Sequence, residues 1–351
     1  MPKALKPHTR EQQLRLWVAN RLGCAPESIA LKTIASDAGF RQYFRFATPS
    51  LWLAVDAPPQ TEDSRQFVAL AHYLSEHHVN TPNILAADET VGFLLVEDFG
   101  DELLHRQLCA TTADELYRAA FVSLINLAAC PDEPSLIPRY NSELLLRELS
   151  IFSEWFVSEL LRYPLNSAEH AMLDATFRLL AHAALEQPQC LVHRDFHSRN
   201  LLIRPNATLG VIDFQGALWG GCTYDLVSLL RDCYIRWPAS QVTAWALEYR
   251  QAAINAGLLD AGIAAATYLR WFDWMGLQRH IKVLGIFARL ELRDNKPHYL
   301  KDLPLVIRYT LEVAQSYPEL KPFADWFCDK LLPLAKQQSW YSDYRHAGNT
   351  Q

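Results

Sequence analysis

The chain has 351 residues, 50% of them hydrophobic, and a formal net charge of −6 at pH 7. This composition can bury a sizeable core, and the length suggests about two domains. A negative net charge offers no basic excess for a nucleic-acid backbone or an anionic membrane surface, so we expect neither as a partner. A small-molecule or protein substrate is the better starting assumption.

The seven cysteines are scattered singly, with no C-x-x-C pair. An odd number cannot form a complete disulfide framework, and the spacing suggests neither a zinc cluster nor a redox motif. The first 13 residues lack the apolar core of a signal peptide, and no stretch approaches the ~20 apolar residues that span a bilayer. We therefore expect a cytoplasmic protein.

The first hundred residues predict one small, mostly β domain. Apolar residues recur at helical spacing over 10–22, which predicts an amphipathic helix. Short segments rich in β-formers then predict an antiparallel meander. The strands are expected at 29–35, 42–47, 51–56, 84–88 and 92–96, with a helix over 62–78 between the third and the fourth.

Beyond Gly100 the pattern changes to long helical periodicities. They predict helices at 113–129, 141–161, 167–186, 239–256 and 262–282. The sequence thus predicts an α+β chain in which residues 1–98 form the small domain and residues 99–351 the larger, helical one. Residues 97–101 are the expected hinge between them.

A polar motif interrupts the helical part. His193-Arg194-Asp195 is followed by Asn200 after four intervening residues, and Asp213 comes thirteen residues after the Asn. Phosphoryl transfer asks a protein mainly for positioning and charge neutralisation. An Asp beside the attacking hydroxyl can orient it and accept its proton, while an Asn and a second Asp supply hard oxygen ligands for Mg²⁺. A lone H-x-D arises often by chance, but the full set between short apolar strands does not.

This motif resembles the aminoglycoside phosphotransferase and choline kinase superfamily, in which H-x-D-x-H-x-x-N is followed by a short strand and I-D-F/W. The resemblance implies a bilobal protein-kinase-like fold, with a small antiparallel-β N-lobe, a larger helical C-lobe, and ATP and Mg²⁺ as cofactors. It assigns Asp195 as the catalytic residue and Asn200 and Asp213 as the metal ligands. It also implies that three residues support the catalytic loop: His193, His197 and Asp225.

The expected nucleotide site has two parts. One is the turn between the first two strands, which alone is an ordinary hairpin turn but beside this motif is a plausible phosphate-binding turn. The other is the hinge, where backbone groups should accept the adenine and the acidic side chains should be solvated or cap the next helix. The candidate residues are Ser36, Asp37, Ala38, Gly39, Phe40, Arg41, Val96, Glu97 and Phe99.

The third strand departs from the usual kinase pattern. Kinases carry a Lys there that pairs with the nucleotide phosphates, but residues 53–56 read Leu-Ala-Val-Asp. Another cation, or the magnesium ions, must then neutralise more of the charge. Arg41 and Arg45 are the best substitutes by position, although Arg45 could equally solvate a strand edge.

Four segments, 37–45, 55–59, 229–234 and 270–280, carry a closer similarity to the bacterial N-acetylmuramate/N-acetylglucosamine anomeric kinases of cell-wall recycling. This similarity implies ATP-dependent phosphorylation of the anomeric hydroxyl of an N-acetylated amino sugar. A sugar site needs aromatic platforms and polar groups, and a lactyl carboxylate needs a cation. The candidates are Glu148, Trp219, Arg231, Asp232, Tyr234 and Arg279.

Two alternatives stay open. One is a kinase for another small hydroxyl compound, such as an aminoglycoside, choline or homoserine; the mixture of Arg and Asp after residue 230 favours a neutral or anionic sugar over these. The other is a pseudokinase that binds a nucleotide without turnover, which the missing strand Lys suggests. The intact Asp195, Asn200 and Asp213 favour an active enzyme.

Overall fold

A computed structural model describes residues 9–34, 40–48, 50–205 and 208–348. Packing divides the chain into two compact units. Unit 1 contains residues 1–126 and 199–215, and unit 2 contains residues 127–198 and 216–351. The division runs through the predicted motif, since Asp195 belongs to unit 2 whereas Asn200 and Asp213 belong to unit 1. The boundary expected at residue 98 lies within unit 1.

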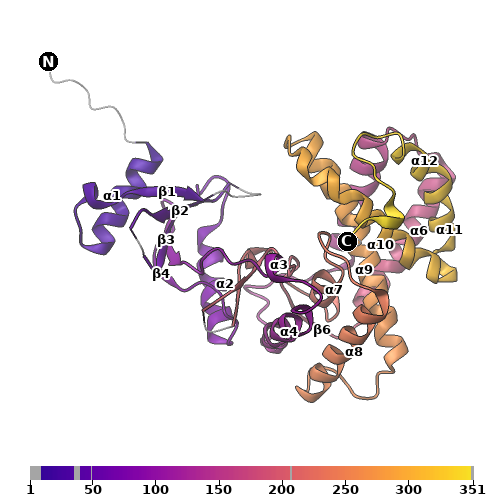
Figure 1. The fold of residues 1–351 in the computed structure, drawn as a ribbon, viewed down its shortest axis with the longest axis horizontal. Helices are drawn as coiled ribbons and strands as arrows, with labels where there is room; N and C mark the ends of the chain where they lie inside the picture. The colour runs from indigo at the N-terminus through magenta and orange to yellow at the C-terminus, as the bar shows by residue number, and fades with distance from the viewer. Residues whose placement is uncertain (1–8, 35–39, 49, 206–207, 349–351) are drawn as a thin grey trace. The chain divides into compact units, whose positions relative to one another are not determined.

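Unit 1 is built on a five-stranded sheet in the order β1-β2-β3-β5-β4, with every neighbouring pair antiparallel (Figure 1). Helix α1 packs on it, because Leu14 and Val18 join Phe44 and Phe93 in one buried cluster. The strands are β1 (Leu31–Ile34), β2 (Gln42–Phe46), β3 (Trp52–Asp56), β4 (Ile84–Asp88) and β5 (Phe93–Glu97). The helices are α1 (Arg10–Leu22), α2 (Ser64–Glu76) and α3 (Leu104–Gln107), followed by α4 (Ala113–Ala129), whose last residues reach unit 2.

Local sequence signals explain where these helices begin and end. Thr9 and Gln12 form a capping box at the start of α1, and Gly23 ends the helix with φ at 66°. Asp63 caps α2 by accepting a hydrogen bond from the Gln66 N–H. Unit 1 also holds the hairpin β7 (Leu201–Ile203) and β8 (Leu209–Val211), which carries the two predicted metal ligands near its ends.

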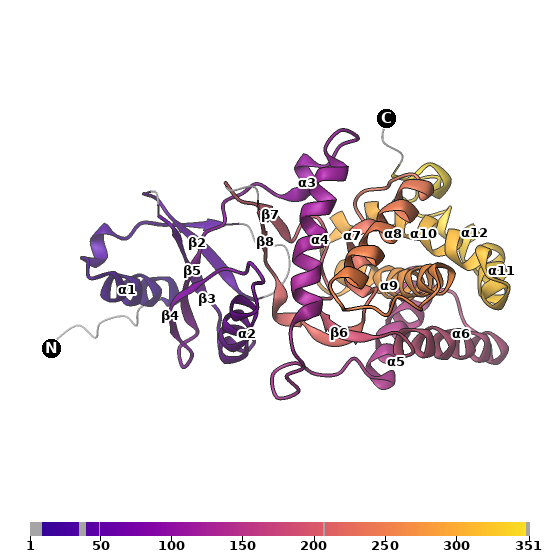
Figure 2. The same cartoon turned by 90° about the horizontal axis from the view of Figure 1, so that it is seen from below.

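Unit 2 is mainly helical, and the long helix α9 (Ala265–Leu292) contacts α5, α6, α7, α8 and α10 (Figure 2). The other helices are α5 (Ser142–Ile151), a π-helix at Phe152–Leu160, α6 (Ser167–Leu185), α7 (Tyr224–Leu230), α8 (Ala239–Asn255), α10 (Leu303–Ser316), α11 (Lys321–Trp326), a second π-helix at Phe327–Leu331, and α12 (Leu332–Ala335). Strand β6 (Gln189–Val192) pairs with β9 (Leu218–Gly221), so that the predicted catalytic loop follows the end of a buried strand.

The predicted α+β fold class is confirmed, and most elements lie within two residues of their expected positions. Two helices differ. The helix expected at 141–161 changes to a π-helix at Phe152. Helix α9 continues ten residues beyond its expected end at 282, because residues 274–282 are all buried and no polar face marks its course.

Gly285 allows α9 to approach the start of the π-helix. A Cβ at this position would lie 2.5 Å from both the carbonyl carbon and the oxygen of Ile151. Because backbone cannot move aside as a side chain can, Gly285→Ala should lower the free energy of unfolding by about 1–3 kcal/mol. Urea denaturation measures this. The matched control is Gly262→Ala, whose Cβ would meet only the Asp260 side chain at 3.3 Å and should change stability little; equal stability losses in both variants would contradict the close-packing explanation.

Candidate active site

Asp225 holds the first part of the catalytic loop. Its carboxylate accepts hydrogen bonds from the backbone N–H groups of His193 at 2.5 Å and Arg194 at 2.9 Å. Burial raises the pKa of Asp225. The electrostatic influence of His193 and the two N–H donors act in the opposite direction. Arg194 has a positive φ of 77°, an uncommon conformation for a residue with a Cβ, so these contacts stabilise a sharp turn just before Asp195.

Asp232 holds the far part of the same loop. One carboxylate oxygen accepts from the Ser198 N–H at 3.0 Å and from its hydroxyl at 2.5 Å, and the other accepts from the Tyr234 N–H at 3.1 Å. Asp232 is 1% exposed. Asp232, a predicted sugar contact, therefore supports the loop from beneath. The sequence predicted this supporting role only for Asp225, His193 and His197.

Asp195 is solvent-exposed between these two supports. Its backbone N–H donates to His193 Nδ1 at 3.3 Å. Desolvation by the surrounding groups acts to raise its pKa, but the positive charges of Lys282 and Arg279 outweigh this effect and the pKa of Asp195 is lowered overall. A carboxylate with a lowered pKa is ionised at neutral pH, so Asp195 can accept a proton there.

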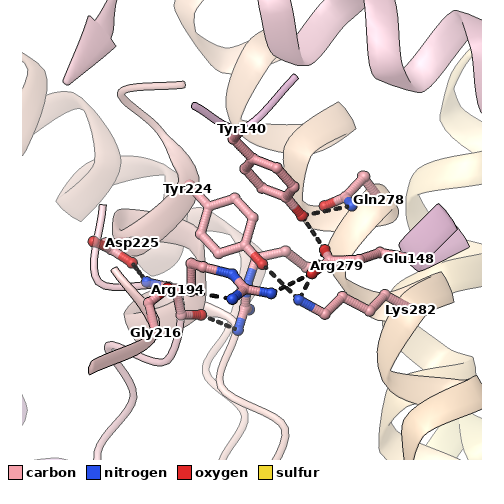
Figure 3. A network of polar contacts seen from close by, with 9 residues as sticks. All are labelled: Tyr140, Glu148, Arg194, Gly216, Tyr224, Asp225, Gln278, Arg279 and Lys282. Carbon is pink, nitrogen blue, oxygen red and sulfur yellow. Dashed lines mark hydrogen bonds and ion pairs between the residues drawn. The ribbon is translucent and has the colours of Figure 1, made fainter. Parts of the chain in front are cut away.

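Glu148 anchors a buried polar network beside the loop (Figure 3). Its carboxylate forms ion pairs with Arg194 and with the Lys282 ammonium, the latter at 2.9 Å, and accepts a hydrogen bond from the Tyr140 hydroxyl. Burial acts to raise the pKa of Glu148, yet Lys282 and Arg194 lower it overall. Glu148, predicted as a sugar contact, is 6% exposed and is the counterion of two cations.

The other predicted sugar contacts lie in different surroundings within unit 2. Arg231 pairs with Asp273, and its guanidinium lies 4.7 Å from the centre of the Phe272 ring. Tyr234 meets the ring of His197 edge to face at 5.6 Å, next to the loop. Trp219 instead lines a cavity of about 220 Å³, with Cys190, Cys222, Tyr249 and Tyr268 among its other walls.

Arg279 is 4% exposed and lies under the catalytic loop. Its guanidinium is 5.1 Å from the centre of the Tyr224 ring and donates a long hydrogen bond of 3.4 Å to the Arg194 carbonyl (Figure 3). Its Nε and Nη1 atoms are buried without a hydrogen-bond partner in the described part of the chain. The structure therefore brings Arg279 close to the loop, whereas Trp219 lines a cavity that no member of the Glu148 network borders.

In unit 1 the two predicted metal ligands point toward each other. Asn200 Nδ2 lies 3.4 Å from Asp213 Oδ2, and the Ile212 N–H donates to the Asn200 carbonyl at 3.1 Å. Gln215 Nε2 donates to the other Asp213 oxygen at 2.6 Å. Mg²⁺ in nucleotide enzymes is held by one or two such side-chain oxygens together with phosphates and water, so this pair fits a nucleotide-bound Mg²⁺. Among the described residues, no group of three or more His, Cys, Asp or Glu side chains could hold a metal by itself.

Arg41 and Arg45 have different environments. Arg45 pairs with Asp98 and Asp101 at 2.6 and 2.5 Å and so fixes the hinge. Arg41 is 5% exposed, pairs with Glu62 at 3.0 Å, and lies 4.3 Å from the centre of the Phe67 ring.

The ring of Phe67 in turn stacks at 5.0 Å on Phe214, which directly follows Asp213. Of the two predicted substitutes for the strand Lys, Arg41 is therefore the one connected by packing to the metal-ligand residue. At the position of that Lys, Asp56 is buried and pairs with Arg10.

Four of the remaining predicted nucleotide contacts lie outside the described residues: Ser36, Asp37, Ala38 and Gly39. Phe40 is 66% exposed, and its N–H donates to Glu62 at 3.2 Å. Val96 is buried in β5, and the ring of Phe99 lies 4.4 Å from the Arg204 guanidinium.

The expectation for the acidic hinge side chains was wrong. Glu97 pairs with Arg204 and also accepts from Asn83 Nδ2 at 2.6 Å. Asp98 binds Arg45, as described above, and accepts from the Gly100 N–H at 2.8 Å. Both carboxylates are thus ion-paired rather than solvated or capping a helix, because arginines distant in sequence fold next to them.

His280 should make stability depend on pH. It is fully buried, its Nε2 lies 3.0 Å from the Arg231 carbonyl, and its ring stacks on Tyr309 at 4.9 Å. Burial first, and then Arg279 and Arg231, lower its pKa to about 3. The unfolded chain binds this proton near pH 6.5 and the folded chain does not, so stability falls as pH drops from about 6.5 toward 3.

The expected loss from His280 between pH 7.5 and 5 is about 2 kcal/mol of unfolding free energy. Urea midpoints of the parent protein and of His280→Gln, measured at both pH values, check this. The variant should be less stable at pH 7.5 but should show a smaller decrease on acidification. Parallel pH profiles would contradict the assignment of a neutral, buried imidazole.

Three residues of the site were not predicted from the sequence: Lys282, Tyr140 and Glu62. Lys282 and Tyr140 complete the Glu148 network, and Glu62 positions Arg41. A lysine inside an otherwise buried helix was the one available signal for Lys282, since a buried ammonium requires a partner.

No helix in the described part of the chain combines the length and apolar character needed to cross a bilayer. Comparison with solved structures shows the fold. An ethanolamine kinase from Plasmodium vivax matches with a TM-score of 0.63 at 11% identity, covering 92% of this chain and 93% of that one. An ADP-bound aminoglycoside phosphotransferase matches with a TM-score of 0.58 at 15% identity, covering 86% of this chain and 98% of that one. The predicted kinase-like fold is confirmed.

Sequence comparison shows the family. A protein of Pseudomonas putida named N-acetylmuramate/N-acetylglucosamine kinase is 39% identical over 323 residues, which cover 89% of this chain and 94% of that protein. One of Neisseria meningitidis with the same name is 38% identical over 324 residues, covering 89% and 93%. The family model described as "Phosphotransferase enzyme family" matches residues 30–264. This chain therefore belongs to the phosphotransferase enzyme family.

Proposed function

We propose that the protein is an ATP-dependent kinase that phosphorylates the anomeric hydroxyl of N-acetylmuramate and N-acetylglucosamine. The relatives that carry these substrates in their names match nearly the whole chain. The observation that carries the proposal is the ionised, exposed Asp195 on a loop held by Asp225 and Asp232. An exposed carboxylate on a fixed loop suits the acceptance of a proton from a bound hydroxyl.

The reaction follows from these roles. The anomeric oxygen attacks the γ-phosphorus of ATP, its proton passes to the Asp195 carboxylate, and the bond from the γ-phosphorus to the bridging oxygen breaks to release ADP. An anomeric hydroxyl is more acidic than an ordinary alcohol, so the lowered pKa of Asp195 still permits proton transfer. Positioning supplies most of the remaining rate enhancement.

Asn200 and Asp213 are the residues that would hold Mg²⁺, which neutralises charge on the nucleotide phosphates when bound. Arg41 is the proposed protein cation at the nucleotide, held by Glu62 and by the Phe67 ring. Arg41, which is buried and held in place by its ion pair with Glu62, can serve as the cation in place of the missing strand Lys. It therefore favours an active kinase over a pseudokinase.

An ADP-release assay over a panel of acceptors tests the proposal. The panel contains both amino sugars, choline, homoserine and an aminoglycoside, each with ATP and Mg²⁺. We expect ADP release with N-acetylmuramate and N-acetylglucosamine and only background release with the other acceptors. Faster turnover of choline, homoserine or the aminoglycoside would identify that compound as the substrate instead. Background rates with every acceptor would favour a nucleotide-binding pseudokinase.

A further inference from the structure

Lys282 places a buried ammonium group beside the catalytic loop. The residue lies on α9 and is 8% exposed. Its Nζ lies 2.9 Å from Glu148 Oε2 and 3.3 Å from the Tyr224 hydroxyl (Figure 3). An ammonium has three N–H donors, and these contacts use two of them. Among the described residues, the third N–H donor of Lys282 has no assigned partner and can bind a ligand.

The Glu148 carboxylate is not the only negative group near these cations, because Asp195 and Asp225 also lie within electrostatic reach of Arg279. The single Glu148 carboxylate pairs with both Arg194 and Lys282. Arg279 adds a third cation, and among the described residues it forms no ion pair with a carboxylate. Buried charge without a counterion is costly, because little water remains to solvate it. An anion that binds here during the reaction would accept hydrogen bonds from the unpartnered Arg279 N–H groups and from the third Lys282 donor.

Asp195 lies within the electrostatic reach of Lys282 and Arg279. Lys282 is the strongest of the positive charges that lower its pKa. Since Asp195 is the proposed acceptor of the substrate proton, these cations act electrostatically on the group beside which the hydroxyl oxygen and the phosphoryl group would react. A cation there stabilises charge that develops on the phosphoryl oxygens in the transition state.

Two anions could fit, and the substrate pair distinguishes them. N-acetylmuramate carries a lactyl carboxylate, but N-acetylglucosamine is neutral. A buried cation reserved for the carboxylate would stay unpaired with the neutral sugar, which would strongly disfavour that substrate. The transferring phosphoryl group is present with either sugar, so the open N–H donors of Lys282 and Arg279 fit the phosphoryl group better.

We propose that Lys282 directly contacts and stabilises the transferring phosphoryl group, with Glu148 and the Tyr224 hydroxyl holding its ammonium in place. The inference rests on the proposed function and adds to it a catalytic cation from α9. Strand β3 of unit 1 carries no lysine at the usual kinase position, where Asp56 lies and pairs with Arg10. Glu148 and Tyr224 are then positioning residues.

The test compares kcat and KM of Lys282→Met with both sugars. The loss of one transition-state contact should lower kcat by about 10²-fold with each sugar and change either KM by less than about 3-fold. Lys282→Arg, which keeps the charge, should recover part of kcat. The matched control is Lys321→Met on the exposed pair with Asp325, which should retain full activity.

A structural role for Lys282 predicts a different result in a double-mutant cycle. If Lys282 served only to neutralise Glu148, then Lys282→Met/Glu148→Gln would regain the activity that Lys282→Met loses, because no unpaired carboxylate would remain. We expect the double variant to stay at least as impaired as Lys282→Met. This variant also carries the test if Lys282→Met alone fails to fold.

Binding of a transition-state mimic gives a readout apart from turnover. ADP, Mg²⁺, aluminium fluoride and either sugar should raise the melting temperature of the parent protein more than ADP, Mg²⁺ and that sugar do. Lys282→Met should lose this additional rise and keep the smaller one. An unchanged additional rise would overturn the proposal.

The outcomes separate the two proposals. If the parent protein phosphorylates neither sugar, the proposed function fails before any variant is made. If it phosphorylates both and Lys282→Met loses activity with N-acetylmuramate alone, the lysine recognises the carboxylate and the inference fails while the function stands. Recovery of activity in the double variant would likewise overturn it.

Discussion

Asp195→Asn should lower kcat by between about 10² and 10⁴ with N-acetylmuramate while ATP affinity stays nearly unchanged. The substitution keeps the shape of the side chain but replaces one accepting oxygen with an NH2 donor and removes the ionised carboxylate that accepts the proton. It leaves Asn200 and Asp213, the proposed metal ligands in unit 1, untouched. Steady-state kinetics and ATP titration of the same preparation check both parts of the expectation.

The matched control for this variant is Asp174→Asn on α6. Asp174 is exposed and belongs to the same unit, so its charge should not affect turnover. A kcat for Asp195→Asn within about 3-fold of the parent value would reject Asp195 as the proton acceptor. Loss of ATP binding in step with kcat would instead indicate that the whole loop had moved.

Asp213→Asn should weaken Mg²⁺-dependent binding of an ATP analogue at least as much as the 10–100-fold that the loss of a supporting contact costs a metal site. Asn is preferred to Ala because Asp213 has φ at 65°, a conformation that Asn tolerates and Ala does not. Titration of a fluorescent ATP analogue with Mg²⁺ and with EDTA separates the metal-dependent part of binding.

Asp213→Ala serves as the comparison for backbone strain. It should lose the same metal-dependent affinity as Asp213→Asn and should also have a lower melting temperature, because a left-handed conformation costs Ala about 1–2 kcal/mol. Equal affinity of the parent protein and Asp213→Asn for the analogue in Mg²⁺ would exclude the metal role.

The sequence predicted what depends on local pattern. Helix α1 begins and ends where a capping box and a glycine place it, and the short strands follow the β-formers between turn residues. The motif from His193 to Asp213 also carries its chemistry locally, since Asn200 and Asp213 lie at the ends of one short hairpin. Such signals need no knowledge of tertiary contacts.

The polar network could not be predicted, because its members meet only in the folded chain. Glu148 was predicted as a sugar contact, and only the fold shows that Arg194 and Lys282 pair with its two oxygens. Asp232 was likewise predicted as a sugar contact, and only the fold shows that its carboxylate accepts hydrogen bonds from Ser198. Local periodicity shows that a helix contains a polar residue but does not reveal which distant charge it faces.

The same limit applies to the choice between Arg41 and Arg45. Arg41 directly precedes β2 and Arg45 lies within it, and the sequence separated them only in that Arg45 could equally solvate a strand edge. The fold separates them by partner, since Arg45 meets the hinge carboxylates and Arg41 meets Glu62 and the Phe67 ring. The missing strand Lys was visible in the sequence, and both arginines were predicted as substitutes, but their partners were not.

Phosphorus NMR of the reaction product tests the central claim most directly. With N-acetylmuramate, ATP and Mg²⁺, we expect one new phosphomonoester signal, split by the proton on the anomeric carbon, and one ADP for each sugar phosphate formed. Asp195→Asn should give almost none of this product in the same time. A phosphate on any other carbon, or ADP accompanied only by inorganic phosphate, would contradict the assignment of an anomeric amino-sugar kinase.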